Sequence, residues 1–104
     1  MKSFKIKIKD EAFSDILEIT AWYNKRVPDL GLRFQKNIKK QITSLKHNAY
    51  SYSIRYHDVR CSLVKKFPFL IHYIIDEAND TVEIFAIIHT SRNPKIWEEK
   101  SENI

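Results

Sequence analysis

The residues best suited to chemistry follow the last long apolar run of this 104-residue sequence, in the segment His89-Thr-Ser-Arg-Asn-Pro94. His89 and Arg92 stand three residues apart, where a predicted strand breaks into a proline turn. An imidazole beside a guanidinium can bind an anion or take part in proton transfer. The alternative is structural: Arg92 would hold the turn together, and His89 would cap the end of the strand.

A second group of cationic residues lies on the predicted strand that begins at Arg60, and continues through Lys65 and Lys66. These residues would form a basic stripe across the sheet, suited to contacts with phosphate groups. An ion pair between Arg60 and Glu83 or Asp76 on a neighbouring strand explains the arginine equally well. The candidates for binding a target or a nucleic acid are therefore Arg60, Lys65, Lys66, His89 and Arg92.

The sequence lacks the signatures of the common enzyme and metal sites. It has no glycine-rich phosphate loop and no nucleophile elbow, and its four histidines are scattered rather than paired at ligand spacing. We therefore expect no metal and no cofactor. His72 lies inside an apolar run and is interpreted as a core or edge histidine with a hydrogen-bond partner. The lone Cys61 favours a reducing compartment.

The N-terminal part of the chain predicts a strand and then a helix. Phe4, Ile6 and Ile8 alternate with lysines, which indicates an edge strand with one buried face and one lysine face. A helix is expected from Asp10, its N-cap, to Lys25. Its predicted apolar stripe follows the helical period and consists of Phe13, Ile16, Leu17, Thr20 and Tyr23, widened by Ile19 and Trp22.

The rest of the chain predicts a second helix, from Asp29 to His47, and then four strands. Pro28 separates the two helices into a hairpin. The strands are expected at residues 54–57, 60–65, 69–76 and 81–89, and the third is apolar on both faces, as in the middle of a sheet. Trp97 is expected to pin the C-terminus over the sheet. The second helix would bury Leu30, Phe34, Ile38, Ile42 and Leu45, and would expose Arg33, Lys36, Lys39, Lys40 and Lys46 to solvent or to phosphate.

The pattern as a whole predicts one α+β domain over residues 1–104, a helical hairpin packed on a mainly antiparallel sheet of about four strands. With 43% hydrophobic residues, the chain can bury a core. We find no signal peptide and no membrane-spanning run, so a cytoplasmic protein without membrane contact is expected. The net charge of +5 favours acidic partners such as nucleic acid, or simply keeps the surface solvated.

Several segments of the sequence are similar to one known family. They are Glu11–Ile16, Asp29–Phe34, Arg60, Lys66–Tyr73 and Val82–Pro94, followed by Trp97. The combination of Arg, Phe-Pro-aromatic, Tyr and then His-x-x-Arg-x-Pro-x-x-Trp resembles the RelE/ParE superfamily of toxins of bacterial type II toxin–antitoxin systems, also called plasmid stabilisation proteins. The resemblance implies a small α+β toxin that inhibits growth and is neutralised by a cognate antitoxin.

The resemblance leaves three functions open. RelE-like members cut mRNA on the ribosome with basic residues on the central strands and a C-terminal aromatic hydroxyl, and in that case Arg60, His89 and Arg92 would be the catalytic residues. This sequence has Phe69 where a catalytic arginine is expected and Trp97 where the tyrosine is expected, and an indole cannot transfer a proton. ParE-like members instead inhibit DNA gyrase by binding, with no catalytic residues. A non-toxic interaction module of the same fold is the third possibility. The departures favour the ParE branch.

The resemblance also implies where an antitoxin would bind. Antitoxins of this family wrap an otherwise disordered tail around the toxin, which couples folding to binding. The wide apolar stripe of the first helix and the lysine-faced strand suit such a partner. The expected antitoxin-binding residues are Phe13, Ile16, Trp22, Lys5 and Lys7.

Overall fold

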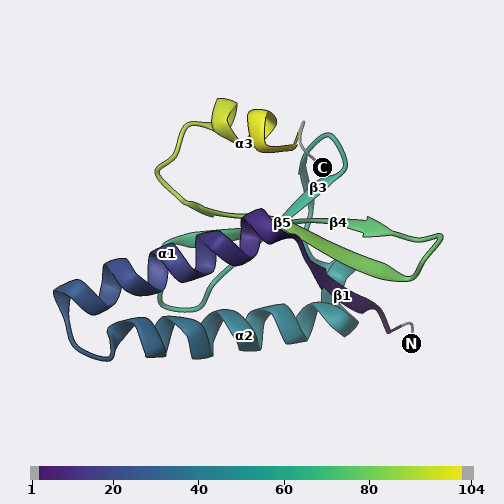
Figure 1. The fold of residues 1–104 in the computed structure, drawn as a ribbon. Coiled ribbons are helices and arrows are strands. Elements are labelled where there is room, and N and C mark those ends of the chain that lie inside the picture. Colours follow the sequence, from purple (N-terminus) through teal and green to yellow (C-terminus); the bar gives the residue numbers. More distant parts are fainter. Residues whose placement is uncertain (1–2, 102–104) are drawn as a thin grey trace.

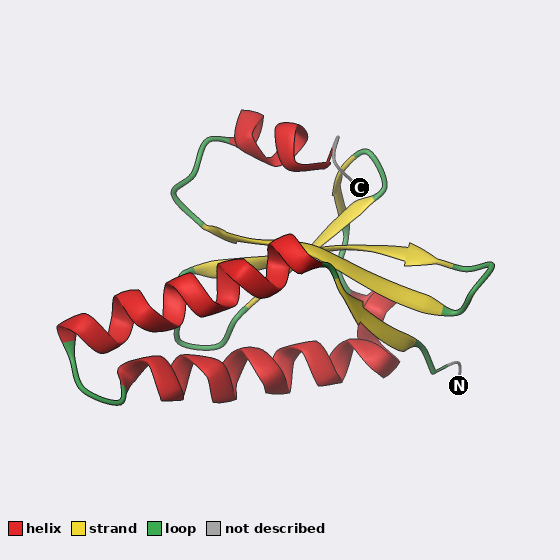
Figure 2. Cartoon of the chain, in the orientation of Figure 1, coloured by secondary structure: helices red, strands yellow, loops and turns green. Residues whose placement is uncertain are grey.

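The computed structural model describes residues 3–101 and shows a mixed five-stranded sheet between helices (Figure 1). The strand order is β1-β5-β4-β3-β2, with β1 parallel to β5 and the other pairs antiparallel. Figure 2 shows the hairpin of two long helices on one side of the sheet and a short helix on the other. The elements are β1 (Lys5–Ile8), α1 (Asp10–Arg26), α2 (Leu30–Asn48), the 3₁₀ turn η1 (Ala49–Ser51), β2 (Ile54–Tyr56), β3 (Val59–Leu63), β4 (Phe69–Asp76), β5 (Thr81–His89) and α3 (Pro94–Ser101).

The predicted α+β class and the helical hairpin are confirmed, and the sheet has one strand more than the four expected. Each of the five strands lies at a segment predicted to be a strand, and the total exceeds about four because the N-terminal strand joins the sheet: β1 pairs with β5 in parallel, and the three-residue β2 forms the opposite edge. β4 lies between β5 and β3, as its two apolar faces predict. β3 ends at Leu63, two residues earlier than expected, so Lys65 and Lys66 lie in a turn.

β1 is an edge strand with exposed lysines, as predicted. Phe4 is buried just before the strand, Ile6 packs against the main core, and Lys5 and Lys7 are exposed. Ile8 departs from the predicted alternation because it is 36% exposed. It is the last residue of the strand, directly before the chain turns into α1, and therefore lies at the edge of the core.

α1 has the predicted length, but its buried face is rotated from the predicted stripe. The inward residues are Ala12, which is fully buried, together with Ile16, Ile19 and Tyr23. Phe13 and Leu17 were expected inside and are 54% and 50% exposed. The small Ala12 side chain faces the sheet in place of the larger neighbours, which allows the helix backbone to lie close to the sheet. The expected N-cap is also wrong, because Lys9 occupies that position and Asp10 begins the first helical turn, where its negative charge suits the helix dipole.

α2 buries the predicted face and crosses α1 at a point of close backbone approach. Phe34, Ile38, Ile42 and Leu45 are buried in the main core. Gly31, the one glycine of the chain, faces α1, and its amide donates a 2.7 Å hydrogen bond to Asn24 Oδ1. A β-carbon at this position would lie 2.6 Å from Asn24 Oδ1 and closer still to the Thr20 carbonyl oxygen, so the helices can meet only over a glycine.

A second apolar cluster lies on the other face of the sheet, beneath α3. Val59, Cys61, Phe85, Ala86 and Ile88 surround the indole ring of Trp97, which is 8% exposed. The predicted role of Trp97 as an anchor over the sheet is therefore confirmed. The helix that carries Trp97 was not predicted, because the Asn-Pro dipeptide before it was interpreted as a turn.

The sequence nevertheless contains a start signal for α3. The Asn93 side chain accepts a 2.9 Å hydrogen bond from the amide of Lys95 and so caps the helix, and Pro94 occupies its first position. Both are typical of a helix N-terminus. An interpretation of Asn93-Pro94 as a cap would have predicted this element.

Candidate functional site

The candidate site lies along the half of β5 that has no strand neighbour on the β1 side. β1 pairs with β5 only as far as Ile84, because the chain then turns into α1. Beyond Ile84 the helix covers the edge of β5 instead. The Asp15 carboxylate on α1 accepts a 3.0 Å hydrogen bond from the Ile87 amide, and this satisfies a backbone donor that a neighbouring strand would otherwise pair.

Asp15 also joins α1 to the C-terminal helix. Lys100 on α3 lies 3.6 Å from Asp15 Oδ1 and 3.2 Å from Glu11 Oε1. Burial raises the pKa of Asp15 above its ordinary value, although the Ile87 amide and Lys100 both oppose the shift. Three elements that are distant in the sequence, α1, β5 and α3, are thus tied together by one carboxylate.

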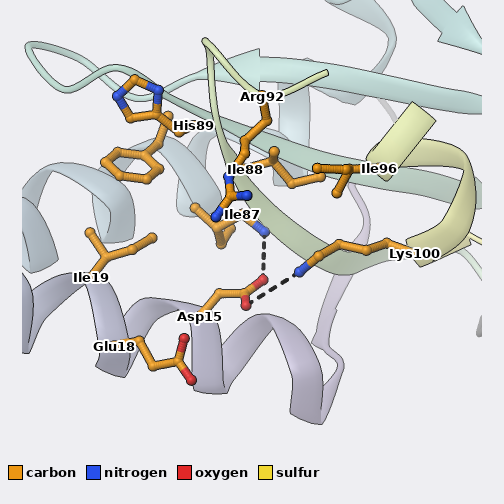
Figure 3. A pocket seen from close by; sticks show the side chains of 10 residues that line it. Asp15, Glu18, Ile19, Ile87, Ile88, His89, Arg92, Ile96 and Lys100 are labelled. Atoms are coloured by element: carbon orange, nitrogen blue, oxygen red, sulfur yellow. Dashed lines mark hydrogen bonds and ion pairs between the residues drawn. The ribbon is translucent and has the colours of Figure 1, made fainter. Parts of the chain in front are cut away.

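Two adjoining hollows open between these elements, and we refer to them together as the α1–β5 groove. The first has a volume of about 250 Å³ and lies between α1, the end of β5 and α3 (Figure 3). The second has a volume of about 500 Å³ and reaches over Trp22, Tyr23 and Pro68. Both are lined by Glu18, Ile19, Phe69, His89 and Arg92.

His89 and Arg92, predicted as a pair, both line the α1–β5 groove. Ser91 donates its amide hydrogen to His89 Nδ1 at 3.0 Å, which ties the ring to the turn. The edge of the ring packs against Phe69 with centroids 5.1 Å apart. The Arg92 amide bonds to the His89 carbonyl at 3.0 Å, while its side chain extends into the groove in Figure 3. These two hydrogen bonds hold the backbone of the turn, and the Arg92 guanidinium has no hydrogen bond or ion pair among the described residues.

Arg60 does not share a hollow with His89 and Arg92. Its guanidinium donates a 2.5 Å hydrogen bond to the Tyr52 carbonyl oxygen and lies 5.2 Å from the centre of the Tyr50 ring. Among the described residues, this contact replaces the expected ion pair with Glu83 or Asp76. Arg60 therefore fixes the segment between α2 and β2.

Lys65 and Lys66 also lie away from the α1–β5 groove, at a turn beside α2. Asn37 on α2 donates a 2.9 Å hydrogen bond to the Lys65 carbonyl oxygen, and Lys66 has a left-handed backbone with φ of 68°. Both lysines are exposed. The five predicted target-binding residues are thus divided among three places: the α1–β5 groove, the Tyr50–Tyr52 segment and the turn after β3.

The residues expected to bind an antitoxin lie on different sides of α1. Phe13 and Trp22 are 54% and 49% exposed. Nine residues of α-helix make two and a half turns, so these two side chains point in opposite directions. Trp22 lines the α1–β5 groove, where Arg26 stacks over its ring at 3.5 Å, whereas Phe13 lies with Leu17 on the other flank. Ile16 packs against the core between them.

The sheet face beneath α3 is built around Trp97 and a buried histidine, with the Arg55 guanidinium 5.7 Å from the centre of the Trp97 ring. His72 is fully buried, with Nδ1 3.0 Å from the Tyr56 hydroxyl and 3.5 Å from Cys61 Sγ, which confirms a core histidine with a partner. Burial lowers the pKa of His72 to about 4, and burial raises the pKa of Cys61 to about 11. Both groups are therefore neutral at physiological pH and suit packing rather than acid–base chemistry.

The sequence interpretation missed the acidic and aromatic half of the groove. Asp15, Glu18, Tyr23 and Lys100 line it or brace it; of these, the helical pattern had singled out Tyr23 alone, and only as a core residue. The available sequence signal for Asp15 was its position directly before Ile16, a core residue of α1. Among the side chains that the structure describes, no group of three or more metal ligands comes together, and no helix in that part of the chain has the length and apolar character of a membrane span.

Solved structures with a similar fold include toxins of the RelE/ParE type, although each has low sequence identity and shows the fold alone. One, from a chromosomal ParDE toxin–antitoxin system of P. aeruginosa, has a TM-score of 0.75 at 18% identity, covering 86% of this chain and 98% of its own. A second, an arginine-to-alanine double mutant of E. coli toxin RelE in the free state, has a TM-score of 0.72 at 10% identity, covering 98% of each chain. A third, from the RelBE2 complex of Mycobacterium tuberculosis, has a TM-score of 0.55 at 14% identity, covering 88% and 97%.

The family assignment comes from the sequence itself. Residues 6–94 match the model of the ParE toxin of the type II toxin–antitoxin system parDE. The chain therefore belongs to this toxin family, as its motifs indicated. No significant match was found among curated protein sequences.

Proposed function

We propose that this protein is a ParE-like toxin that inhibits DNA gyrase by binding to it and is neutralised by a cognate antitoxin. The observation that carries the proposal is the match to the ParE toxin model over residues 6–94. The target-binding surface we propose is the α1–β5 groove, where His89 and Arg92 meet the exposed ring of Trp22. A hollow of about 500 Å³ is large enough to receive side chains of a partner protein.

The arrangement of the titratable groups supports inhibition by binding rather than RNA cleavage. A nuclease needs a general acid or base in contact with its substrate. Arg60 is engaged with Tyr52 and does not share a hollow with His89 and Arg92, so the three residues expected to be catalytic in a nuclease do not form one cluster. The sheet face under α3 is built around Trp97 and a neutral His72, which suit packing rather than acid–base chemistry.

We further propose that the antitoxin covers the exposed apolar flank of α1. Phe13 and Leu17 are each at least half exposed, and Ile8 lies near them at the end of β1 beside the lysines at 5 and 7. A segment that folds on binding gains its affinity from burying apolar area of this kind. The ParDE and RelBE2 structures come from toxin–antitoxin systems, which agrees with such a partner.

The test is a supercoiling assay with purified gyrase and this protein. We expect the protein to block supercoiling and Arg92→Ala to weaken inhibition about tenfold or more, because a buried charged contact at an interface is worth roughly 1.5–3 kcal/mol. Lys95→Ala, three residues away and exposed, is the matched control and should inhibit like the parent. Normal supercoiling at saturating protein would refute the proposal. Cleaved transcripts after induction would instead support the RelE-like alternative.

A further inference from the structure

A basic groove lies between α2 and the turn that joins β3 to β4, apart from the α1–β5 groove. It consists of two adjoining hollows of about 300 and 280 Å³, which share Asn37 and Lys66. None of the described residues that line the two hollows is acidic. The cations that line the basic groove are Arg33, Lys36, Lys40, Lys65 and Lys66.

The fold places these cations on a firm support. Arg33, Lys36 and Lys40 follow the i, i+3, i+7 spacing, so they occupy one face of α2 within roughly 10 Å along its axis. The facing turn is fixed by the bond from Asn37 to the Lys65 carbonyl oxygen. It is also fixed by Phe67, whose ring packs edge-on against Phe34 with centroids 5.4 Å apart. The charges therefore stay together although their side chains are exposed.

Among the described residues, none of the five charges has an ion-pair partner. The salt bridges found in the described part of the chain join Lys100 to Glu11 and Asp15, and none involves the basic groove. Like charges gathered at one place repel one another and raise the local potential. A bound polyanion would relieve that repulsion and release its own counterions, which is the main source of affinity in non-specific nucleic-acid binding.

The lining of the basic groove favours a phosphate backbone over an acidic peptide. Its apolar members, Leu30 and Phe67, are already partly buried in the fold, so they offer little area to a peptide that must fold on binding. Contacts to a phosphate backbone require only well-placed cations and carry no sequence information. We infer that the basic groove binds duplex DNA through its phosphates. The choice of DNA rests on the proposed function, because gyrase acts on duplex DNA.

The first test measures binding of a short fluorescent DNA duplex by anisotropy at increasing salt concentration. Five phosphate contacts predict a slope of log K against log salt of about −4.5, or a roughly 500-fold loss of affinity between about 50 and 200 mM salt. The triple variant Lys36→Gln, Lys40→Gln, Lys65→Gln should bind more weakly at every salt concentration, and its slope should fall to about −2. The matched control is Lys5→Gln, Lys7→Gln, Lys95→Gln, which removes the same charge from exposed residues elsewhere.

The outcomes separate this inference from the proposed function. If the two triple variants lost the same affinity for DNA, the basic groove would not be the binding site, and net charge alone would account for the binding. Tighter binding of duplex RNA or of polyglutamate than of DNA would overturn the choice of DNA. A protein that inhibits gyrase but fails to bind DNA refutes the inference alone. A protein that binds DNA through these lysines without affecting gyrase refutes the proposed function alone.

Discussion

The contact between the two long helices predicts that Gly31→Ala destabilises the protein, although alanine is the better helix former. The intrinsic preference favours alanine by about 1 kcal/mol. Against this, a methyl group would press on Asn24 and on the Thr20 carbonyl oxygen. Overpacking of this kind costs about 1–3 kcal/mol, and loss of the bond between the Gly31 amide and Asn24 costs about 1 kcal/mol more. The sum of these contributions predicts that Gly31→Ala lowers the free energy of unfolding by about 2 kcal/mol.

Urea unfolding followed by circular dichroism measures this loss directly. The midpoint should move to lower urea at an unchanged slope, and the melting temperature should fall by about 8 °C. Leu32→Ala, at the exposed neighbouring position, is the control and should change stability little. A second background, Asn24→Ala, removes the side-chain obstacle but leaves the Thr20 carbonyl, so Gly31→Ala should still destabilise there. A Gly31→Ala protein as stable as the parent would refute the close approach of the helices.

Two further predictions concern the cluster beneath α3. The pKa of buried His72 is about 4 in the fold against an ordinary value of 6.5, so His72 contributes stability above pH 6.5 that is lost as the pH falls towards 4. Urea unfolding should show that the free energy of unfolding falls by up to about 3 kcal/mol across this pH range. His72→Leu should remove most of that pH dependence. If the variant kept the same pH profile as the parent, His72 would not be a buried neutral imidazole. Trp97→Ala should cost about 3–5 kcal/mol. Trp97→Phe should destabilise the protein much less, because it keeps an aromatic ring in the cluster and removes an indole N–H that has no partner among the described residues. Equal losses of stability for the two variants in thermal unfolding would contradict this account.

The sequence predicted the elements of this fold better than the faces that those elements bury. Alternation in β1 and the helical period in α2 depend on local pattern, and both predicted the observed burial except for Ile8, which is exposed, and Leu30, which is only partly buried. The face of α1 was misjudged because Phe13 and Leu17 are more apolar than Ala12, and hydrophobicity alone ranks them as core. The face of α1 that is buried depends on how closely the helix approaches β5. That distance is a property of the tertiary structure and cannot be predicted from a local sequence pattern.

The candidate site was predicted only where it is local in sequence. His89 and Arg92 share one turn, so their proximity followed from spacing. Asp15 and Lys100 meet across α1 and α3, and Arg60 turns towards Tyr52 instead of joining the lysines after β3. These contacts depend on the strand order, because the arrangement of the sheet brings distant segments of the chain together. The strand order could not be predicted from the local sequence patterns.

The parallel pairing of β1 with β5 has a consequence for how the protein is made. The first strand of the chain finds its partner only in the last one, at Thr81–Ile84. During synthesis the α1–α2 hairpin can form early from local contacts, but the sheet edge beside β1 stays open until β5 has left the ribosome. A chain interrupted before β5 would lack the strand that carries His89 and that Asp15 contacts. We therefore expect the α1–β5 groove, and any activity that depends on it, to form only after β5 has been synthesised.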